Sequence, residues 1–185
     1  MNSLPKEIGG DDAVWIPFED SSPHPVWLAV YTRSRHEQAV KRQLNGKGIE
    51  NFLPLYEKKS RWKDRVKQIS LPLFPGYLFV HVPIRDRLKV LETAGVVNIV
   101  SNGLTPLPIP EREILNVQTF VESGLKTDPH PYLKAGRRVR IIEGPLTGVE
   151  GILVRKKSGS CLVLSIDMIQ RSVSVELESW KIEGI

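Results

Sequence analysis

Cysteine is almost absent from this sequence, since Cys161 is the single one among 185 residues. One cysteine excludes an intramolecular disulfide and a cysteine-based zinc site. The four histidines are dispersed, and none lies at metal-ligand spacing from a partner. The glycines of residues 144–151 lack the lysine and the following helix of a phosphate-binding loop. These absences predict a protein that is not an enzyme and that needs no metal or cofactor.

Long hydrophobic runs are missing as well, because no segment approaches the roughly 18 apolar residues that a membrane span needs. The N-terminal residues 1–7 lack the basic and then apolar order of a signal peptide. The composition is globular, with 41% hydrophobic and 25% charged residues. We therefore expect a soluble cytoplasmic protein that has no membrane partner and is a monomer.

Positive charge is concentrated in one part of the chain. Residues 31–70 contain eleven basic against four acidic residues, whereas residues 1–30 contain five acidic and one basic residue. Much of the positive charge lies in residues 58–67, which we expect to form a long hairpin with its turn at residues 63–65. Such a belt indicates a polyanion near one face, and nucleic acid is the polyanion that it suggests first. A solvated charged surface is the alternative, and charge alone favours it.

The first part of the chain has the pattern of an α+β domain. Residues 1–25 are predicted to be a disordered acidic tail, because they are rich in proline and acids and show no apolar period. In residues 26–124, strand-like and helix-like segments follow in the order βαβββαβα. This order predicts an antiparallel sheet with flanking helices.

Local signals place the helices of this domain. Ser34 and Glu37 fit a capping box at the start of the first helix. A second helix is expected over residues 85–94, with Leu88 and Leu91 facing inward. Pro110 is expected to begin the third. The inward residues of the third helix are expected to be Ile114, Val117 and Val121.

The last part of the chain is predicted to be a small β-barrel. Residues 125–133 contain two prolines and are expected to be a linker. In residues 134–185, apolar and polar residues alternate over five short segments that are separated by turn residues. Five short strands of this kind favour a barrel that closes its own sheet edges. Through residues 161–177 the same alternation favours strands over a helical form.

Aromatic residues make up only 7% of the chain, but they gather on two predicted strands. The strand period of two places Tyr77, Phe79 and His81 on one face of the later strand. It places Trp27 and Tyr31 on one face of the earlier strand. If these strands are neighbours, they present a contiguous aromatic patch, which usually marks an interaction site. The alternative is a core covered on both faces with the third helix underneath, and the pattern weighs the two equally.

Two kinds of partner suit an aromatic patch on a sheet. One is RNA, because residues 76–82 overlap the aromatic submotif of RNA-recognition domains, although Pro75, Leu78 and Val82 depart from it. The other is an apolar helix or helical hairpin of a protein, laid across the sheet. An apolar patch beside a basic hairpin suits a protein partner that itself lies on nucleic acid.

Three segments resemble the NusG/RfaH family of transcription elongation factors. They read Trp27-Leu-Ala-Val-Tyr31, Leu71-Pro-Leu-Phe-Pro-Gly-Tyr-Leu-Phe-Val80 and Gly144-x-x-x-Gly148-x-x-Gly151. The resemblance covers residues 26–185 in family order. It implies an N-terminal NusG domain (26–124), a linker (125–133) and an SH3-like KOW barrel (134–185). The sequence of residues 73–80 resembles specialised operon-specific paralogues more than the housekeeping factor.

The resemblance implies a function in transcription. In this family the N-terminal domain binds the clamp helices of the largest RNA polymerase subunit, bridges the cleft over the DNA and suppresses pausing or termination. The polymerase-binding residues implied here are Trp27, Tyr31, Phe74, Tyr77, Phe79 and Ile99.

The resemblance also gives the basic residues and the barrel a role. Basic residues at the first helix and on the hairpin would contact DNA, in particular the exposed non-template strand. The residues implied are Arg33, Arg35, His36, Arg61, Lys63 and Arg65. The KOW barrel, with its motif glycines Gly144, Gly148 and Gly151, would contact a ribosomal protein or a termination factor. Specialised members carry a threonine-rich segment at the second helix, where this chain has the charged residues 85–89.

Two other functions remain open at this point. KOW barrels also occur in ribosomal proteins, so the chain fits an RNA-binding or ribosome-associated module. A structural scaffold without a polyanion partner is the second alternative.

Overall fold

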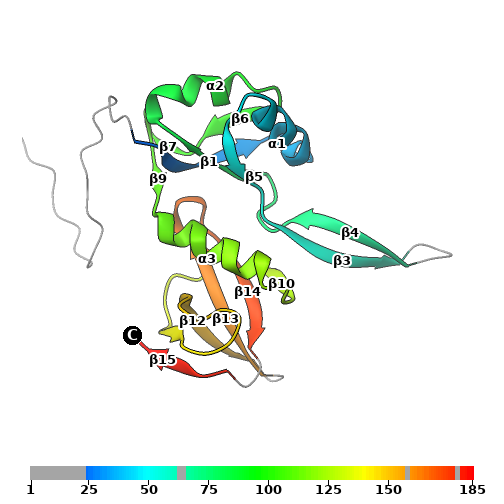
Figure 1. The fold of residues 1–185 in the computed structure, drawn as a ribbon, viewed down its shortest axis with the longest axis vertical. Coiled ribbons are helices and arrows are strands. Elements are labelled where there is room, and N and C mark those ends of the chain that lie inside the picture. Colours follow the sequence, from blue (N-terminus) through cyan, green and yellow to red (C-terminus); the bar gives the residue numbers. More distant parts are fainter. Residues whose placement is uncertain (1–23, 62–65, 157–158, 178–179) are drawn as a thin grey trace, which may run out of the picture.

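The computed structural model describes residues 24–61, 66–156, 159–177 and 180–185. An upper sheet with two helices, a long central helix and a lower sheet follow one another along the molecule (Figure 1). The predicted acidic tail lies almost entirely outside the described residues.

The upper sheet is antiparallel, as predicted. Its strand order is β2 (Glu50–Phe52), β5 (Tyr77–Val82), β1 (Val26–Thr32) and β6 (Val96–Ile99), and the short β9 (Pro108–Ile109) also pairs with β1. The register of β1 and β5 sets Tyr31 opposite Tyr77 and Ala29 opposite Phe79. The two aromatic strands are therefore neighbours, with their rings on the same face.

The aliphatic face of this sheet is covered by two helices. Leu28 and Val30 of β1 pack with Leu78 and Val80 of β5 in one buried cluster. The cluster also contains residues of α1 (Glu37–Gly46) and α2 (Arg87–Leu91). Burial of this stripe is what the alternation in both strands predicts.

Two details of these helices differ from the prediction. The N-cap of α1 is His36, and no side chain caps the helix, so the capping box is wrong. The second helix is a 3-10 turn, η1 (Ile84–Asp86), followed by a single α-helical turn. Leu88 and Leu91 are exposed, and Ile84 and Val90 are buried instead. The tighter 3-10 turn shifts the phase of the helix and thereby changes the buried face.

The basic hairpin is present. Its strands β3 (Leu55–Arg61) and β4 (Val66–Pro72) pair with each other and project away from the body (Figure 1). A second, minute hairpin is formed by β7 (Ser101–Asn102) and β8 (Thr105–Pro106).

The third helix, α3 (Glu111–Glu122), follows Pro110 as predicted. Ile114, Val117 and Phe120 are fully buried, and Val121 is partly buried. α3 contacts β1 of the upper sheet and β13 of the lower sheet. It therefore lies as a middle layer between the two sheets.

The lower sheet, which we call the C-terminal β domain, is antiparallel. Its strand order is β10 (Thr127–His130), β14 (Arg171–Leu177), β13 (Gly159–Ile166), β12 (Glu150–Lys156), β11 (Arg137–Ile141) and β15 (Ile182–Gly184). A 3-10 turn, η2 (Asp167–Ile169), connects β13 to β14. The predicted all-β character is confirmed. Two differences are that the expected linker contains β10, which pairs with β14, and that this pairing leaves β10 and β15 at the edges.

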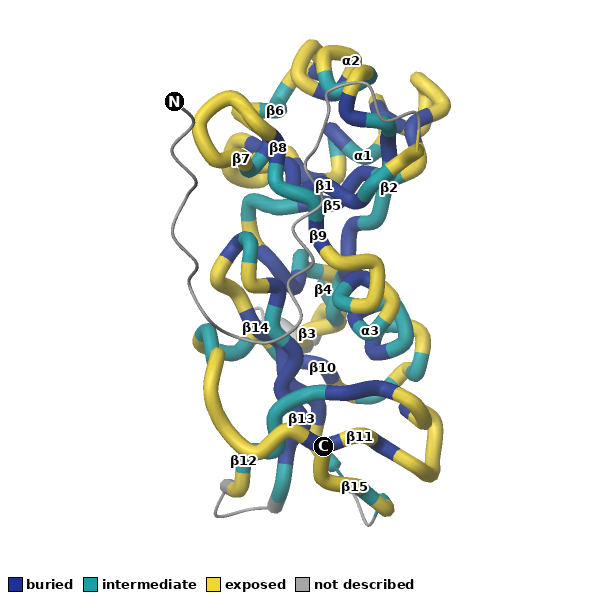
Figure 2. Tube along the Cα trace, turned by 90° about the vertical axis from the view of Figure 1, so that its left-hand side faces the viewer, coloured by how far each residue is buried: buried dark blue, intermediate teal, exposed yellow. Residues whose placement is uncertain are grey.

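A second buried cluster joins the two sheets. It begins with Trp27, Ala29 and Phe79 of the upper sheet, continues through the buried stripe of α3, and ends among the apolar residues of the β domain. Figure 2 shows buried segments running through the middle of the molecule. The two predicted domains therefore share one core.

Glycine is required at positions 144, 148 and 151 for different structural reasons. Gly144 and Gly148 have φ values of +105° and +87°, which other residues rarely adopt. Gly151 is different, because a Cβ atom there would lie 2.7 Å from the carbonyl oxygen of Val163 on the neighbouring strand. The motif thus combines two turn positions with one close approach of backbones.

We predict that Gly151→Ala lowers the free energy of unfolding by about 1–3 kcal/mol, because strand backbone yields poorly to an added methyl group. The control is Gly46→Ala at the end of α1, where nothing lies within 4 Å of the added Cβ. That variant should be neutral or slightly stabilising. Urea denaturation followed by far-UV circular dichroism measures both, and equal stability of the two variants would contradict this account.

Candidate functional site

The aromatic residues of the upper sheet form one continuous surface, which we call the aromatic face: Trp27, Tyr31, Phe74, Tyr77 and Phe79. The Tyr31 and Tyr77 ring centroids are 5.2 Å apart. The Phe74 and Phe79 rings meet edge to face at 5.7 Å, and Trp27 stacks on His81 at 4.9 Å. The strand pattern thus correctly grouped Trp27, Tyr31, Tyr77 and Phe79. Phe74, which only the resemblance implied, lies against Phe79.

Ile99, the sixth residue of the predicted set, lies elsewhere. It is opposite Val30 on β1 and is buried in the cluster under α1 and α2. It therefore belongs to the aliphatic face and not to the aromatic one. Phe52 was not predicted but joins the aromatic residues, with its ring centroid 6.2 Å from that of Phe79. Phe52 lies on β2, an edge strand next to β5. The periodicity of β5 alone could not predict which strand pairs with it, so Phe52 was missed.

Most of the aromatic face is covered by the protein itself. Phe79 and Phe74 are 0% and 1% exposed, and Trp27 is 6% exposed. Tyr31 is 41% exposed, and Tyr77 beside it is half-buried. The expectation of an open patch is therefore wrong for three of the rings, and the alternative with the third helix underneath is what the structure shows. We call the accessible remainder, Tyr31 and Tyr77, the tyrosine rim.

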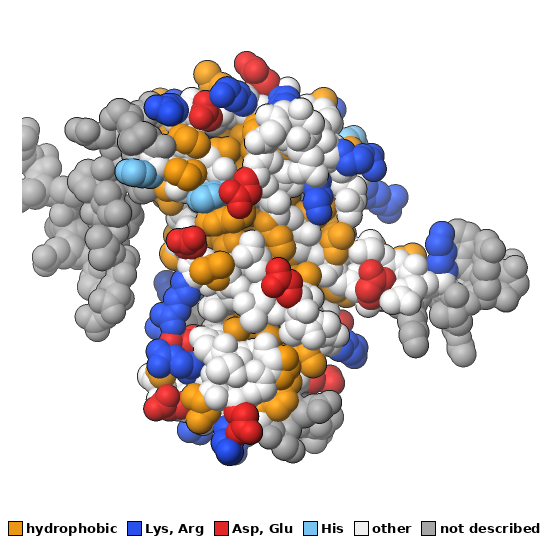
Figure 3. Space-filling model, in the orientation of Figure 1, with side chains coloured by type: hydrophobic (Ala, Val, Ile, Leu, Met, Phe, Trp, Pro, Cys, Tyr) orange, Lys and Arg blue, Asp and Glu red, His pale blue; other side chains and the backbone are white. Residues whose placement is uncertain are grey.

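The covering layer is amphipathic. The buried stripe of α3 belongs to the same cluster as the covered rings. In the space-filling view, hydrophobic side chains gather where the upper sheet meets the layer below it (Figure 3). A helix with one apolar stripe therefore already occupies the aromatic face.

Polar contacts hold α3 to the β domain. The buried carboxylate of Glu150 on β12 pairs with both Arg112 of α3 and Arg140 of β11. The side-chain amide of Asn116, one turn after Arg112, donates to the backbone oxygen of Glu150 at 3.4 Å. Burial raises the pKa of Glu150, but hydrogen bonds from the two arginines outweigh it, and the pKa lies below its ordinary value.

A second polar group lies in the same contact. The Tyr132 hydroxyl donates to Oδ1 of Asp167 on η2 at 3.0 Å. Glu113 of α3 faces Asp167, whose backbone N–H donates to its carboxyl group. Burial, and secondly the negative charge of Asp167, raise the pKa of Glu113 to about 7.

The turn that enters β5 is fixed by two residues outside it. Glu37 is buried at the start of α1, and its Oε1 accepts a hydrogen bond from the Gly76 N–H at 2.8 Å. The Thr32 N–H donates to the Gly76 carbonyl at 2.8 Å. Gly76 has φ +83°, and a Cβ atom there would lie 3.1 Å from the Tyr31 ring. These contacts place the tyrosine rim against the start of α1.

The predicted nucleic-acid residues are only partly described. Arg33, Arg35 and His36 are exposed and adjoin the N-terminus of α1. Among the described residues, neither arginine has an ion pair. Of Arg61 only the backbone is described, at the end of β3, and Lys63 and Arg65 lie outside the described residues.

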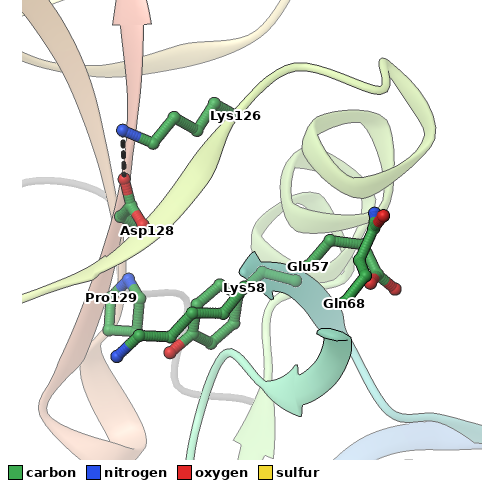
Figure 4. Close-up of a pocket in the computed structure, with 7 residues that line it drawn as sticks. Glu57, Lys58, Gln68, Lys126, Asp128 and Pro129 are labelled. Atoms are coloured by element: carbon green, nitrogen blue, oxygen red, sulfur yellow. Dashed lines mark ion pairs between the residues drawn. The ribbon is translucent and has the colours of Figure 1, made fainter. Parts of the chain in front are cut away.

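A hollow of about 650 Å³ lies beside the base of the hairpin. Figure 4 shows its lining residues: Tyr56, Glu57, Lys58, Gln68, Lys126, Asp128 and Pro129. Lys126 and Asp128 pair with each other at 3.6 Å. The two lysines and two acids balance, so the hollow has no net charge to attract a charged ligand. Its lining residues show that the base of the hairpin lies next to β10 of the β domain.

Neither a metal-binding cluster nor a membrane-spanning helix is found in the described part of the chain. No group of three or more His, Cys, Asp or Glu side chains there is arranged to hold a metal ion. No helix in the same residues has the length and apolarity to cross a membrane.

Comparison with known proteins gives a consistent result. Residues 25–118 match the family model NusG, which is described as "Transcription termination factor nusG". The "Transcription termination/antitermination protein NusG" of Lactococcus lactis is 25% identical over 86% of this chain and 92% of its own length. The protein of that name from Staphylococcus carnosus is 28% identical over 86% of this chain and 95% of its own length.

One solved structure has the same fold. It is titled "Domain interaction in Thermotoga maritima NusG", with a TM-score of 0.52 and 22% sequence identity. The match covers 87% of this chain and 97% of the other.

We predict that Glu37→Ala lowers the free energy of unfolding by about 1.5–3 kcal/mol, because it leaves the Gly76 N–H without its charged acceptor. Glu37→Gln keeps an acceptor and should lose less. Gln38→Ala, at the exposed neighbour on α1, is the control. Chemical denaturation measures stability and the Gly76 amide chemical shift reports the bond. An Ala variant as stable as the control would show that this bond contributes nothing.

Proposed function

The chain belongs to the NusG family of transcription factors, and on that premise we propose that its aromatic face binds the clamp helices of the largest RNA polymerase subunit. Members of this family are transcription factors and not enzymes. We further propose that the bound protein bridges the cleft over the DNA and suppresses pausing or termination.

The observation that carries this proposal is the packing of α3 on the aromatic face. The stripe Ile114, Val117 and Phe120 of this helix is fully buried in the cluster that joins the sheet and the β domain. Helices that pack on a surface do so through rows of side chains that fit its grooves. The aromatic face is therefore a surface of the right shape and chemistry for an apolar helix of a partner.

Access to this surface requires movement in the protein. The tyrosine rim is available first, and the buried rings of Trp27, Phe74 and Phe79 become available only when the cover of α3 and the β domain is displaced. Binding energy from the clamp helices must offset the loss of the internal contact. The partner then selects an open form, which is a shift of population by differential binding.

The physical role follows from where the protein would lie. A factor that joins the two sides of the polymerase cleft holds the clamp closed over the DNA. A closed clamp disfavours the paused arrangement, because the paused form would have to break the bridging contacts. No covalent chemistry is involved.

The exposed basic residues would add a contact to DNA. Arg33, Arg35 and His36 lie together at the start of α1, next to the tyrosine rim. Cationic side chains bind phosphates without reading sequence, and their contribution falls with salt. The polymerase and the exposed non-template strand would then be bound side by side. The β domain would recruit a ribosomal protein or a termination factor, and the protein would act as a cytoplasmic monomer.

We predict that replacing Tyr31 and Tyr77 with Ala weakens binding to purified RNA polymerase by about 2 kcal/mol or more, roughly 30-fold in Kd. These two are chosen because they are accessible, whereas truncation of the buried Phe79 would cost about 3–5 kcal/mol of stability. Titration of fluorescently labelled protein with polymerase gives the affinity.

Leu104→Ala is the matched control, because Leu104 is 98% exposed and lies on the β7–β8 turn. It should bind as the native protein does. If the tyrosine variant binds polymerase normally and loses affinity for single-stranded RNA, the chain is an RNA-binding module instead.

A second prediction concerns salt. Replacing Arg33 and Arg35 with Ala should flatten the salt dependence of binding to an elongation complex that exposes the non-template strand. Each lost contact to single-stranded phosphate lowers the slope of log K against log salt by about 0.7. Arg171→Ala, an exposed change on β14 of the β domain, is the control. An unchanged slope in the Arg33 and Arg35 variant would exclude these residues from the DNA contact.

A further inference from the structure

The contact between α3 and the β domain contains a carboxyl group without a full set of partners. Glu113 lies in the first turn of α3, and its Oε2 is buried and has no hydrogen-bond partner. The backbone N–H of Asp167 donates to this carboxyl group across the contact. A buried carboxylate oxygen without a partner loses hydration and gains nothing in return. The contact therefore favours the protonated form of Glu113.

The charged groups around Glu113 do not neutralise it. From the β domain, Asp167 on η2 faces it with the same sign of charge, and Tyr132 donates to that aspartate. The arginine next to Glu113 on the helix, Arg112, pairs with Glu150 on β12, together with Arg140 of β11. Within the described residues, no basic side chain pairs with Glu113.

We propose that the contact between α3 and the β domain is a proton-sensitive latch: it holds while Glu113 carries a proton and loosens when Glu113 ionises. Loosening separates the β domain from α3 and opens the core that now includes the aromatic face. The last consequence, easier binding of a polymerase helix, rests on the proposed function, whereas the latch itself does not.

The direction of the pH effect follows from the pKa of Glu113 in the two states. In the closed form burial raises it from 4.5 to about 7, and after separation the carboxyl group is in water and regains the ordinary value. At a pH below the ordinary pKa of Glu113, this residue is protonated in both the closed and the separated form, and the contact has its full strength. As pH rises toward 7 the separated form loses its proton first, so separation becomes up to tenfold more favourable per pH unit. Above pH 7 both forms are ionised, so the equilibrium for separation, by then roughly 10²-fold more favourable than at low pH, no longer changes with pH.

Other groups of the contact titrate outside this window. The pKa of Glu150 lies below its ordinary value, so its contribution to the closed form is present above that value and is lost only at lower pH. Burial raises the pKa of Tyr132 above its ordinary value of 10. Between pH 5 and pH 7.5, Glu113 is therefore the group of this contact that changes charge.

Amide hydrogen exchange of the full chain tests the latch without any polymerase. The reporter is the Asp167 N–H, whose bond to Glu113 crosses the contact, and the reference is the buried Leu164 in β13. Protection of Asp167, corrected for intrinsic exchange and divided by that of Leu164, should fall by roughly 10²-fold from pH 5 to pH 7.5. Glu113→Gln, a neutral isostere of the protonated form, should remove this fall and keep Asp167 protected throughout.

Glu111→Gln is the matched control, because Glu111 is exposed in the same first turn of α3. It removes the same charge and should keep the fall in protection. The difference between the two variants also separates Glu113 from any histidine that titrates nearby. The same pH profile in native protein and Glu113→Gln would overturn the latch.

A second variant covers the case in which Glu113→Gln does not fold. Asp167→Asn removes the like charge but keeps an acceptor for Tyr132, so the fall in protection should become smaller; an unchanged fall would also overturn the latch. Polymerase affinity of the native protein, measured separately over the same range, should rise with pH. If protection behaves as expected and polymerase does not bind at any pH, the latch stands and the proposed function fails.

Discussion

The structure depends on one interface, at which the aromatic face of the upper sheet packs on α3. The sheet buries its aliphatic side under α1 and α2, as a sheet in a two-layer domain must. Its second side carries Trp27, Phe74 and Phe79, which would otherwise be a large exposed apolar area. α3 covers that side, and the β domain packs on α3. The same rings thus stabilise the closed molecule and form the surface we propose for polymerase binding, so that the two uses exclude each other.

This competition sets the energetics of binding. A partner helix must replace contacts that the protein already makes, and affinity for the partner falls by the fraction of molecules that are closed. The polar part of the α3 contact is less favourable than the apolar part. Glu150 is satisfied by two arginines, whereas Glu113 retains an orphan oxygen beside Asp167. An interface held by strong apolar packing and a weak polar edge can separate without unfolding either part.

Much of this architecture follows from local sequence signals. The period of two in β1 and β5 predicted which rings share a face, and Pro110 predicted the start of α3. What failed depends on tertiary contacts. Glu37 fits a local capping box, but Gly76, distant in sequence, uses its carboxylate. Ile99 was assigned to the aromatic face, yet its pairing with Val30 turns it to the other side. The cover over Phe79 was one of two equally weighted alternatives, and the sequence could not decide between them because the stripe on α3 does not reveal which surface it buries.

The most direct test of the account is nuclear magnetic resonance of the isotope-labelled full chain on addition of RNA polymerase. Residues 26–124 should broaden beyond detection because they join a very large complex. Signals of the β domain should persist with narrow lines, because it has separated from α3 and moves independently of residues 26–124. Loss of all signals together would show that the molecule binds closed, and persistence of all signals would show that it does not bind; either result contradicts the account.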